Sequence, residues 1–188
     1  MRGVVAVVLA LVFVACASSK AEPDLGPCVA DSQEPNDSAT ARRELGSIQD
    51  DDAPGQSSPS PKRIQKELTL HSDTDVDWFD VDVRDTGIGG NPGLRVIVDN
   101  GFAATAWWDC TTGTTESVVC GLGEAVTNDP ELAGRGCKTA ASNGAPPQLT
   151  MQIECAGTST DNGTLHIRVV RAGATGSCAR YRMTVEAE

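Results

Sequence analysis

Apolar and polar side chains alternate along most of the chain after residue 63. Leu94, Val96 and Val98 occupy every second position of GLRVIVD. The same spacing recurs in Leu68/Leu70, Phe79/Val81/Val83, Leu149/Met151/Ile153/Cys155, Leu165/Ile167/Val169 and Tyr181/Met183/Val185. Successive side chains of a strand point to opposite faces, so this period predicts strands with one buried face. Clusters of Gly, Asn, Pro and Thr separate the runs, which indicates a single all-β domain, an antiparallel, jelly-roll-like β-sandwich.

Two segments before residue 64 depart from the alternation. The stretch ATARRELG, residues 39–46, predicts one short N-terminal helical turn. Residues 47–63, SIQDDDAPGQSSPSPKR, carry almost no apolar side chain. Such a composition cannot bury enough surface to order itself, so we expect a disordered loop at about 47–63. The domain is expected to span residues 28–188, because a fold beginning after the loop would strand Cys28.

Residues 1–27 are expected to lie outside the fold. Arg2 and the apolar run from Val4 to Ala15 are typical of a secretory signal. The run of about 12 residues is too short to span a membrane. Phe13-Val14-Ala15-Cys16 resembles a bacterial lipobox, which would make 1–15 a lipoprotein signal peptide and 16–27 a tether. Ala15-Cys16-Ala17 also satisfies the small-x-small rule of ordinary secretion, so both cleavages remain open.

The cysteine count favours lipidation of Cys16. The chain has seven cysteines, an odd number for an exported protein. Acylation of Cys16, for example by palmitate, would anchor the protein in a lipid bilayer, and Ala17 after it suggests the outer membrane. Without acylation the protein would be secreted. The six remaining cysteines permit three disulfides: Cys28, Cys110, Cys120, Cys137, Cys155 and Cys178.

Several disulfide pairings fit the spacing of the six cysteines, and we expect Cys110–Cys120 as a hairpin staple, Cys137–Cys155 as a loop-to-strand link and Cys28–Cys178 as a clasp between the ends. This is one of fifteen possible sets. The cysteines lack the short paired spacing of a zinc site.

The formal net charge of −11 limits the classes of partner. Nucleic acids and anionic membrane surfaces attract clusters of Lys and Arg, so an acidic chain is not expected to bind either. The predicted partner is therefore an unidentified protein or polysaccharide rather than a nucleic acid.

Two acidic segments carry a family resemblance. EPNDS at 34–38, followed by Ala41, Leu45-Gly46 and then DTDVDWFDVDV at 73–83, resembles the bacterial pre-peptidase C-terminal domain. That family is a β-sandwich appended to secreted proteases, including collagenases, and it is also found alone in lipoproteins. The six cysteines indicate a disulfide-bearing, stand-alone branch of the family.

The resemblance also implies a calcium site. In collagenase members the segments that match these two bind calcium. The carry-over names as ligands Glu34, Asn36, Asp37, Asp75 and Asp77, with Asp73 nearby. Calcium takes six to eight oxygens, which side chains, carbonyls and water could supply. Ser32 stands where those members have a further glutamate. The alternative is a polar turn in which Asp37 or Ser38 caps the helical turn.

The aromatic residues and histidines suggest little chemistry. Trp78 is expected to pack in the core or between sheets. Trp107 and Trp108 are neighbours that would point to opposite faces of a strand, so one is a candidate for an exposed binding surface. The alternative is that the second packs under a loop or against the Cys110 bridge. No catalytic role is expected for His71, whose neighbours in sequence seldom converge as a triad, or for His166, which should face solvent.

These observations predict a non-enzymatic, lipid-anchored β-sandwich of the cell envelope that acts as a binding or structural module and is stabilised by calcium. The alternative is an accessory or targeting domain for a separately encoded secreted hydrolase, such as a protease.

Overall fold

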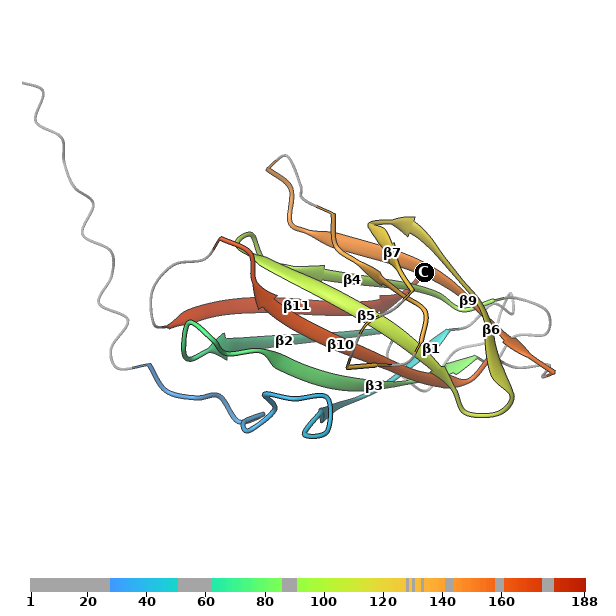
Figure 1. The fold of residues 1–188 in the computed structure, drawn as a ribbon, viewed down its shortest axis with the longest axis horizontal. Helices are drawn as coiled ribbons and strands as arrows, with labels where there is room; N and C mark the ends of the chain where they lie inside the picture. The colour runs from blue at the N-terminus through green and yellow to red at the C-terminus, as the bar shows by residue number, and fades with distance from the viewer. Residues whose placement is uncertain are drawn as a thin grey trace, which may run out of the picture.

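The computed structural model describes residues 28–50, 62–85, 91–127, 129, 131–132, 134–140, 144–157, 161–173 and 178–188. Two sheets face one another, which confirms the predicted β-sandwich (Figure 1). The six-stranded sheet has the order β1 (Arg43–Asp50), β3 (Asp77–Asp85), β10 (Gly163–Arg171), β5 (Phe102–Cys110), β8 (Gly136–Lys138) and β7 (Glu124–Val126). The five-stranded sheet has the order β2 (Arg63–Leu70), β11 (Ala179–Ala187), β4 (Gly93–Val98), β9 (Gln148–Ala156) and β6 (Thr114–Leu122).

The hydrophobic core lies between the two sheets and follows the alternation in the sequence. The side chains of Leu94, Val96 and Val98 on β4 are buried, and the residues between them are partly exposed. The inward-facing residues of β3, β9, β10 and β11 join the same cluster. Burial of this apolar face is the main favourable contribution to folding, at roughly 25 cal/mol for each Å² removed from water.

The helical turn predicted at 39–46 is wrong. Arg43–Asp50 forms strand β1, which pairs in parallel with β3, an exception to the antiparallel pairing of the other strands. Leu45 and Ile48 are both buried although they are three residues apart, a spacing that suggests a helix. The register of β1 shifts between Glu44 and Ser47, where Gly46 has φ of 120°. This irregularity turns both apolar side chains to the core, and pairing with β3 satisfies the strand's backbone groups.

The bounds of the disordered loop expected at about 47–63 are wrong at both ends. Ser47–Asp50 belongs to β1 and Arg63 begins β2, while residues 51–61 lie outside the described residues. The segment has few apolar residues, but Ile48 is one of them. Its side chain is fully buried in the core, which favours the strand at this position.

Three disulfides join the six cysteines that remain without Cys16. The Cys28–Cys178 clasp is confirmed, but the other two expected pairs are wrong: the bonds are Cys110–Cys155 and Cys120–Cys137. The prediction placed Cys110 and Cys120 in one hairpin of a single sheet. The chain instead changes sheet between β5 and β6, so each cysteine pairs across the sandwich.

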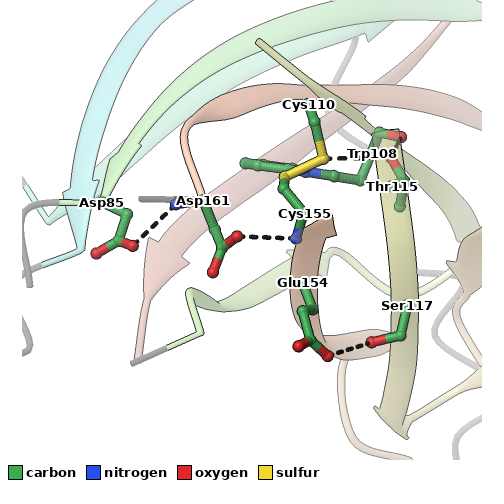
Figure 2. The surroundings of a disulfide bond; sticks show 8 residues. All are labelled: Asp85, Trp108, Cys110, Thr115, Ser117, Glu154, Cys155 and Asp161. Atoms are coloured by element: carbon green, nitrogen blue, oxygen red, sulfur yellow. Dashed lines mark hydrogen bonds between the residues drawn. A yellow bond between two sulfur atoms is a disulfide. The ribbon is translucent and has the colours of Figure 1, made fainter. Parts of the chain in front are cut away.

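The Cys110–Cys155 bond is packed by a tryptophan (Figure 2). Trp108 Nε1 lies 3.3 Å from Cys110 Sγ and 3.4 Å from Cys155 Sγ. Beside it, Asp161 Oδ1 accepts a hydrogen bond from Cys155 N, and Asp85 Oδ2 accepts one from Asp161 N. These contacts hold the ends of β3 and β9 to the loop that precedes β10.

One side of the sandwich is closed by a continuous run of chain. β6 ends at Leu122 in the five-stranded sheet, and β7 begins at Glu124 in the six-stranded sheet. Gly123 makes this change of sheet, with φ of 92°. A Cβ at this position would lie 2.3 Å from Lys138 O. Both the backbone conformation and the close approach therefore require glycine.

No helix among the residues in the described ranges is long and apolar enough to cross a membrane.

Replacing Gly123 should destabilise the fold more than replacing a glycine with the same backbone conformation in open space. Gly144 provides the control, with φ of 87° and no atom within 4 Å of the place that a Cβ would occupy. We expect Gly144→Ala to lower the free energy of unfolding by about 1 kcal/mol and Gly123→Ala by about 3 kcal/mol. Urea unfolding measures both. Equal losses would contradict the close approach of Gly123 to β8.

Candidate metal centre

The N-terminal segment 31–37 is fastened to the end of β2 and the beginning of β3. Asp31 Oδ2 accepts a hydrogen bond from Thr69 N at 2.8 Å, on a strand at the free edge of its sheet. Asn36 O accepts one from Trp78 N at 2.9 Å. Arg43 Nε donates to Gln33 O at 3.0 Å. These bonds bring the segment that contains EPND against the strand entry that contains DVDW.

Three side chains from these elements converge on one point. His71 follows β2 directly, and its Nδ1 lies 2.8 Å from Glu34 Oε1 and 2.7 Å from Asp75 Oδ2. One ligand atom from each of the three residues lies within 4.8 Å of the others. Two carboxylates and an imidazole nitrogen at this separation form a donor set that can hold a metal ion.

The carboxylates of this cluster are held in place by backbone groups. Glu34 Oε2 accepts a hydrogen bond from Asn36 N at 3.2 Å, and Asp75 Oδ2 accepts one from His71 N at 2.6 Å. The side chain of Asp75 is fully buried and that of Glu34 is only 10% exposed. The remaining oxygens, Asp75 Oδ1 and Glu34 Oε1, are buried and make no hydrogen bond to the described part of the protein.

Two further buried residues near the cluster have unsatisfied polar atoms. Neither Asn36 Oδ1 nor Asn36 Nδ2 has a hydrogen-bond partner within the described ranges, and the same holds for Asp77 Oδ1. The other oxygen of Asp77 accepts a hydrogen bond from Tyr181 Oη at 2.5 Å. An unsatisfied buried polar group costs about 1–3 kcal/mol, so several in one place indicate that a bound ion or water completes their contacts.

The buried carboxyl groups of the cluster have raised pKa values, because several negative charges lie close together where little water reaches them. Burial raises the pKa of Asp77 to about 7, against the lowering effect of the Tyr181 hydrogen bond, and the charges of Asp75, Asp31 and Glu34 add to the rise. Burial also raises the pKa of Asp75, as do the nearby Asp37 carboxyl and the Glu34 charge. Carboxylates this close cannot all ionise without a compensating positive charge.

His71 supplies part of that compensation. Although its partial burial lowers its pKa, the charges of Asp75 and Glu34 raise the pKa above the usual value overall. A bound cation would satisfy the same carboxylates more fully, because it can accept several oxygen ligands at once.

The structure groups most of the ligands proposed from the sequence. Glu34 and Asp75 meet at His71, and Asn36 and Asp77 are buried close by. Asp37 is exposed but near enough to affect the pKa of Asp75. Asp73 is 80% exposed and lies 3.9 Å from Arg171, outside the cluster.

The capping alternative does not hold, because no helix follows Asp37 and Ser38. Ser38 O instead accepts a hydrogen bond from Ala41 N in a tight turn before β1. The turn itself is present and coexists with the acidic cluster.

Sequence reasoning missed His71 as a possible ligand. The sequence prediction gives it no role, because its neighbours in sequence seldom converge as a triad. The available signal was that His71 comes directly after a strand and four residues before Asp75. A turn of that length can bring the two side chains together.

The binding surface expected at Trp107 or Trp108 is wrong, because both side chains are buried, at 1% and 2% exposed. Trp108 faces the core and the disulfide. Trp107 lies on the outer face of the six-stranded sheet, where its ring stacks on Trp78 at 5.8 Å and 16°. Arg168 covers both rings, at 5.2 and 5.4 Å from their centroids. Trp78 is therefore buried, but on this outer face rather than between the sheets.

His166 also differs from the prediction that it faces solvent. Its Nδ1 lies 2.6 Å from Asp80 Oδ1 in a regular hydrogen bond, and its side chain is only 12% exposed. Arg42 Nε contacts the same carboxylate at 2.9 Å. Burial raises the pKa of Asp80, but His166 and Arg42 outweigh it and lower the pKa overall.

Comparison with known proteins adds little to this picture. No family model matches the chain, and no curated protein matches it. A solved structure of the surface-associated copper-binding protein CorA, important in copper acquisition by Methylomicrobium album BG8, is similar with a TM-score of 0.34 and 10% identity, covering 76% of this chain and 97% of that one. A likeness this low supports no inference about ligand or activity. The resemblance to the pre-peptidase C-terminal domain stays a prediction.

The raised pKa of Asp77 predicts a pH dependence of stability in chelator. The carboxyl has a pKa of about 7 in the folded protein and about 4 when unfolded, so between these values the folded state holds the extra proton. The contribution of Asp77 to the free energy of unfolding is therefore fully present below about pH 4. It is lost as the pH rises toward 7, by up to about 1.4 kcal/mol per pH unit. Urea unfolding between pH 4.5 and 7.5 measures this slope.

Asp77→Asn should remove this part of the slope, since an amide keeps an acceptor for Tyr181 but does not titrate. The control is Asp73→Asn at an exposed position, which should keep the slope. An unchanged slope in Asp77→Asn would contradict the assignment.

Proposed function

We propose that the protein is a non-enzymatic, lipid-anchored module of the cell envelope in which a bound calcium ion fastens the N-terminal segment to the β-sandwich. The observation that carries this proposal is the cluster of buried, unsatisfied oxygens where segment 31–37 meets the start of β3. Calcium fits it by chemistry: the cluster offers carboxylates from Glu34, Asp75 and Asp77 and the amide oxygen of Asn36. The bacterial pre-peptidase C-terminal resemblance favours the same ion.

The position of the cluster supports a mechanical role for the ion. The Cys28–Cys178 bond ties the first described residue to the residue just before β11. The cluster begins a few residues after Cys28 in the sequence, at Glu34. A cation at Glu34 and Asp75 would join the segment to the sandwich at a second point. Together these two links would transmit a pull on the lipid-anchored N-terminus directly to the folded domain.

A catalytic role is not part of the proposal. The Nδ1 atoms of both histidines face carboxylates, Glu34 and Asp75 for His71 and Asp80 for His166, and neither is positioned beside a serine or cysteine nucleophile in the described contacts. The binding partner is proposed to be a protein or polysaccharide of the envelope. Loss of hydrolytic turnover in His71→Ala, if a hydrolase screen found any, would overturn the non-enzymatic assignment.

Calcium should stabilise the disulfide-bonded protein. We expect millimolar calcium to raise the Tm by roughly 5 °C over the value in chelator, as binding at about a hundredfold excess over Kd would do. The shift should disappear in Asp77→Ala and Asp75→Ala. The exposed Asp99, whose carboxylate accepts a bond from Arg182 N elsewhere, supplies the control Asp99→Ala. Differential scanning calorimetry measures the shift, and its absence in the unaltered protein would refute the calcium proposal.

The lipid anchor has a separate test. In a bacterial host the unaltered chain should fractionate with the outer membrane and incorporate labelled palmitate. Cys16→Ser should abolish the label and release the protein in soluble form, since the six other cysteines are all in disulfides. Soluble, unlabelled unaltered protein would favour ordinary secretion instead.

A further inference from the structure

The two histidines of the chain contact carboxylates in different ways. His166 Nδ1 makes a regular hydrogen bond to Asp80 Oδ1 at 2.6 Å. His71 Nδ1 lies as close to two carboxylate oxygens, at 2.7 and 2.8 Å, yet has hydrogen-bond geometry with neither. An N–H bond on Nδ1, which lies in the plane of the ring, therefore points along neither contact. It would point along one of them if the nitrogen were simply a hydrogen-bond donor. One ligand atom each from His71, Glu34 and Asp75 lies within 4.8 Å of the other two, as the ligands of one ion would.

A hydrogen bond from the backbone of His71 holds the Asp75 carboxylate beside the imidazole. His71 N donates to Asp75 Oδ2 at 2.6 Å, the same oxygen that faces the ring nitrogen, and Asp75 N in turn approaches Ser72 O at 3.4 Å. The turn 71–75 therefore fixes the histidine and the aspartate relative to each other. The side chain of His71 is 36% exposed, so solvent reaches the imidazole directly.

The fully buried Asp75 side chain is the second observation that points to a ligand. Its Oδ1 is buried without any hydrogen-bond partner in the described part of the chain, while its Oδ2 faces His71 Nδ1. In Glu34 the two contacts fall on different oxygens: Oε2 accepts the bond from Asn36 N and Oε1 lies beside His71 Nδ1. A backbone N–H thus orients each carboxylate, as supporting bonds do around metal ligands, and each keeps one oxygen without a hydrogen bond.

We propose that this site binds a first-row divalent transition ion, with Zn²⁺ as its probe, through His71 Nδ1, Glu34 Oε1 and the Asp75 carboxylate. This rests on the cation site of the proposed function and names a further ion for it. Imidazole nitrogen suits zinc and its neighbours, whereas calcium prefers oxygen alone.

The spacing of the donor atoms fits such an ion. Zinc holds nitrogen at 2.0–2.1 Å and carboxylate oxygen at 2.0–2.2 Å, which places neighbouring ligand atoms of a tetrahedron roughly 3.4 Å apart. The contacts of 2.7 and 2.8 Å would need to open by about 0.6–0.7 Å, a small movement for the end of a partly exposed ring. Three protein ligands leave a fourth position for water.

The chain offers few competing ligands, so the test is clean. It has two histidines, and every cysteine of the described domain is in a disulfide. Zinc affinity is measured by competition with a chelating dye, using disulfide-bonded protein carrying Cys16→Ser. We expect one Zn²⁺ per chain. His71→Asn, which places an amide near the position of Nδ1, should weaken zinc binding about tenfold or more and change calcium affinity less than about threefold.

His166→Asn is the matched control, because it removes the other imidazole, and it should leave zinc affinity unchanged. His71→Ala is the second variant, should His71→Asn not fold by near-ultraviolet circular dichroism. Imidazole nitrogen NMR provides a direct readout: zinc should shift the Nδ1 resonance of His71 and not that of His166.

The outcomes separate the two proposals. Zinc affinity that is the same in both His71 variants and the unaltered protein would overturn the zinc assignment, while a calcium-dependent rise in Tm would still support the calcium site. Zinc binding that depends on His71, with no calcium shift, would support zinc and refute calcium. No response to either ion would overturn both.

Discussion

Negative charge gathered in a poorly hydrated space is the constraint on which the N-terminal half of this structure depends. Glu34, Asp75 and Asp77 approach one another where the first segment meets the sandwich, and Asp75 and Asp77 are buried. Like charges in such a place raise one another's pKa and favour separation. The segment nevertheless lies against β2 and β3, held by backbone bonds through Asp31 and Asn36. Something positive must therefore balance the carboxylates, whether a proton, the His71 ring or a metal ion.

The rest of the sandwich gives this junction a rigid base. Two disulfides, Cys110–Cys155 and Cys120–Cys137, cross between the sheets, and the continuous β6–β7 run closes the same side. The opposite side, where β1 and β2 form the sheet edges, has no such closure by strands within the described ranges. Asp31 covers part of it by accepting a bond from Thr69 N of β2. The acidic junction thus lies at the side of the sandwich where β2 is an edge strand.

The outer face of the six-stranded sheet is organised differently. There a cation covers aromatic rings: Arg168 lies over the stacked Trp78 and Trp107 and pairs with Asp129 and Glu131. Trp78 and Trp107 are buried here although they do not belong to the core cluster. Two tryptophans thus pack outside the core, while the other aromatic residues of the described ranges join the aliphatic side chains between the sheets: Phe79, Phe102, Trp108 and Tyr181.

The period-two alternation by itself determined the sandwich, because a strand with one apolar face must bury that face against another sheet. Residues such as Val96, Ile153 and Ile167 lie inside as the pattern predicts. The two acidic segments also predicted which carboxylates gather, and the structure brings Glu34, Asp75 and Asp77 together. Tertiary structure alone decided which cysteines pair, because the chain changes sheet after Cys110. It also decided that Leu45 and Ile48 belong to a bulged strand and that His71 joins the cluster. Each of these depends on contacts between residues distant in sequence or on a local bend, and hydrophobic spacing carries no information about either.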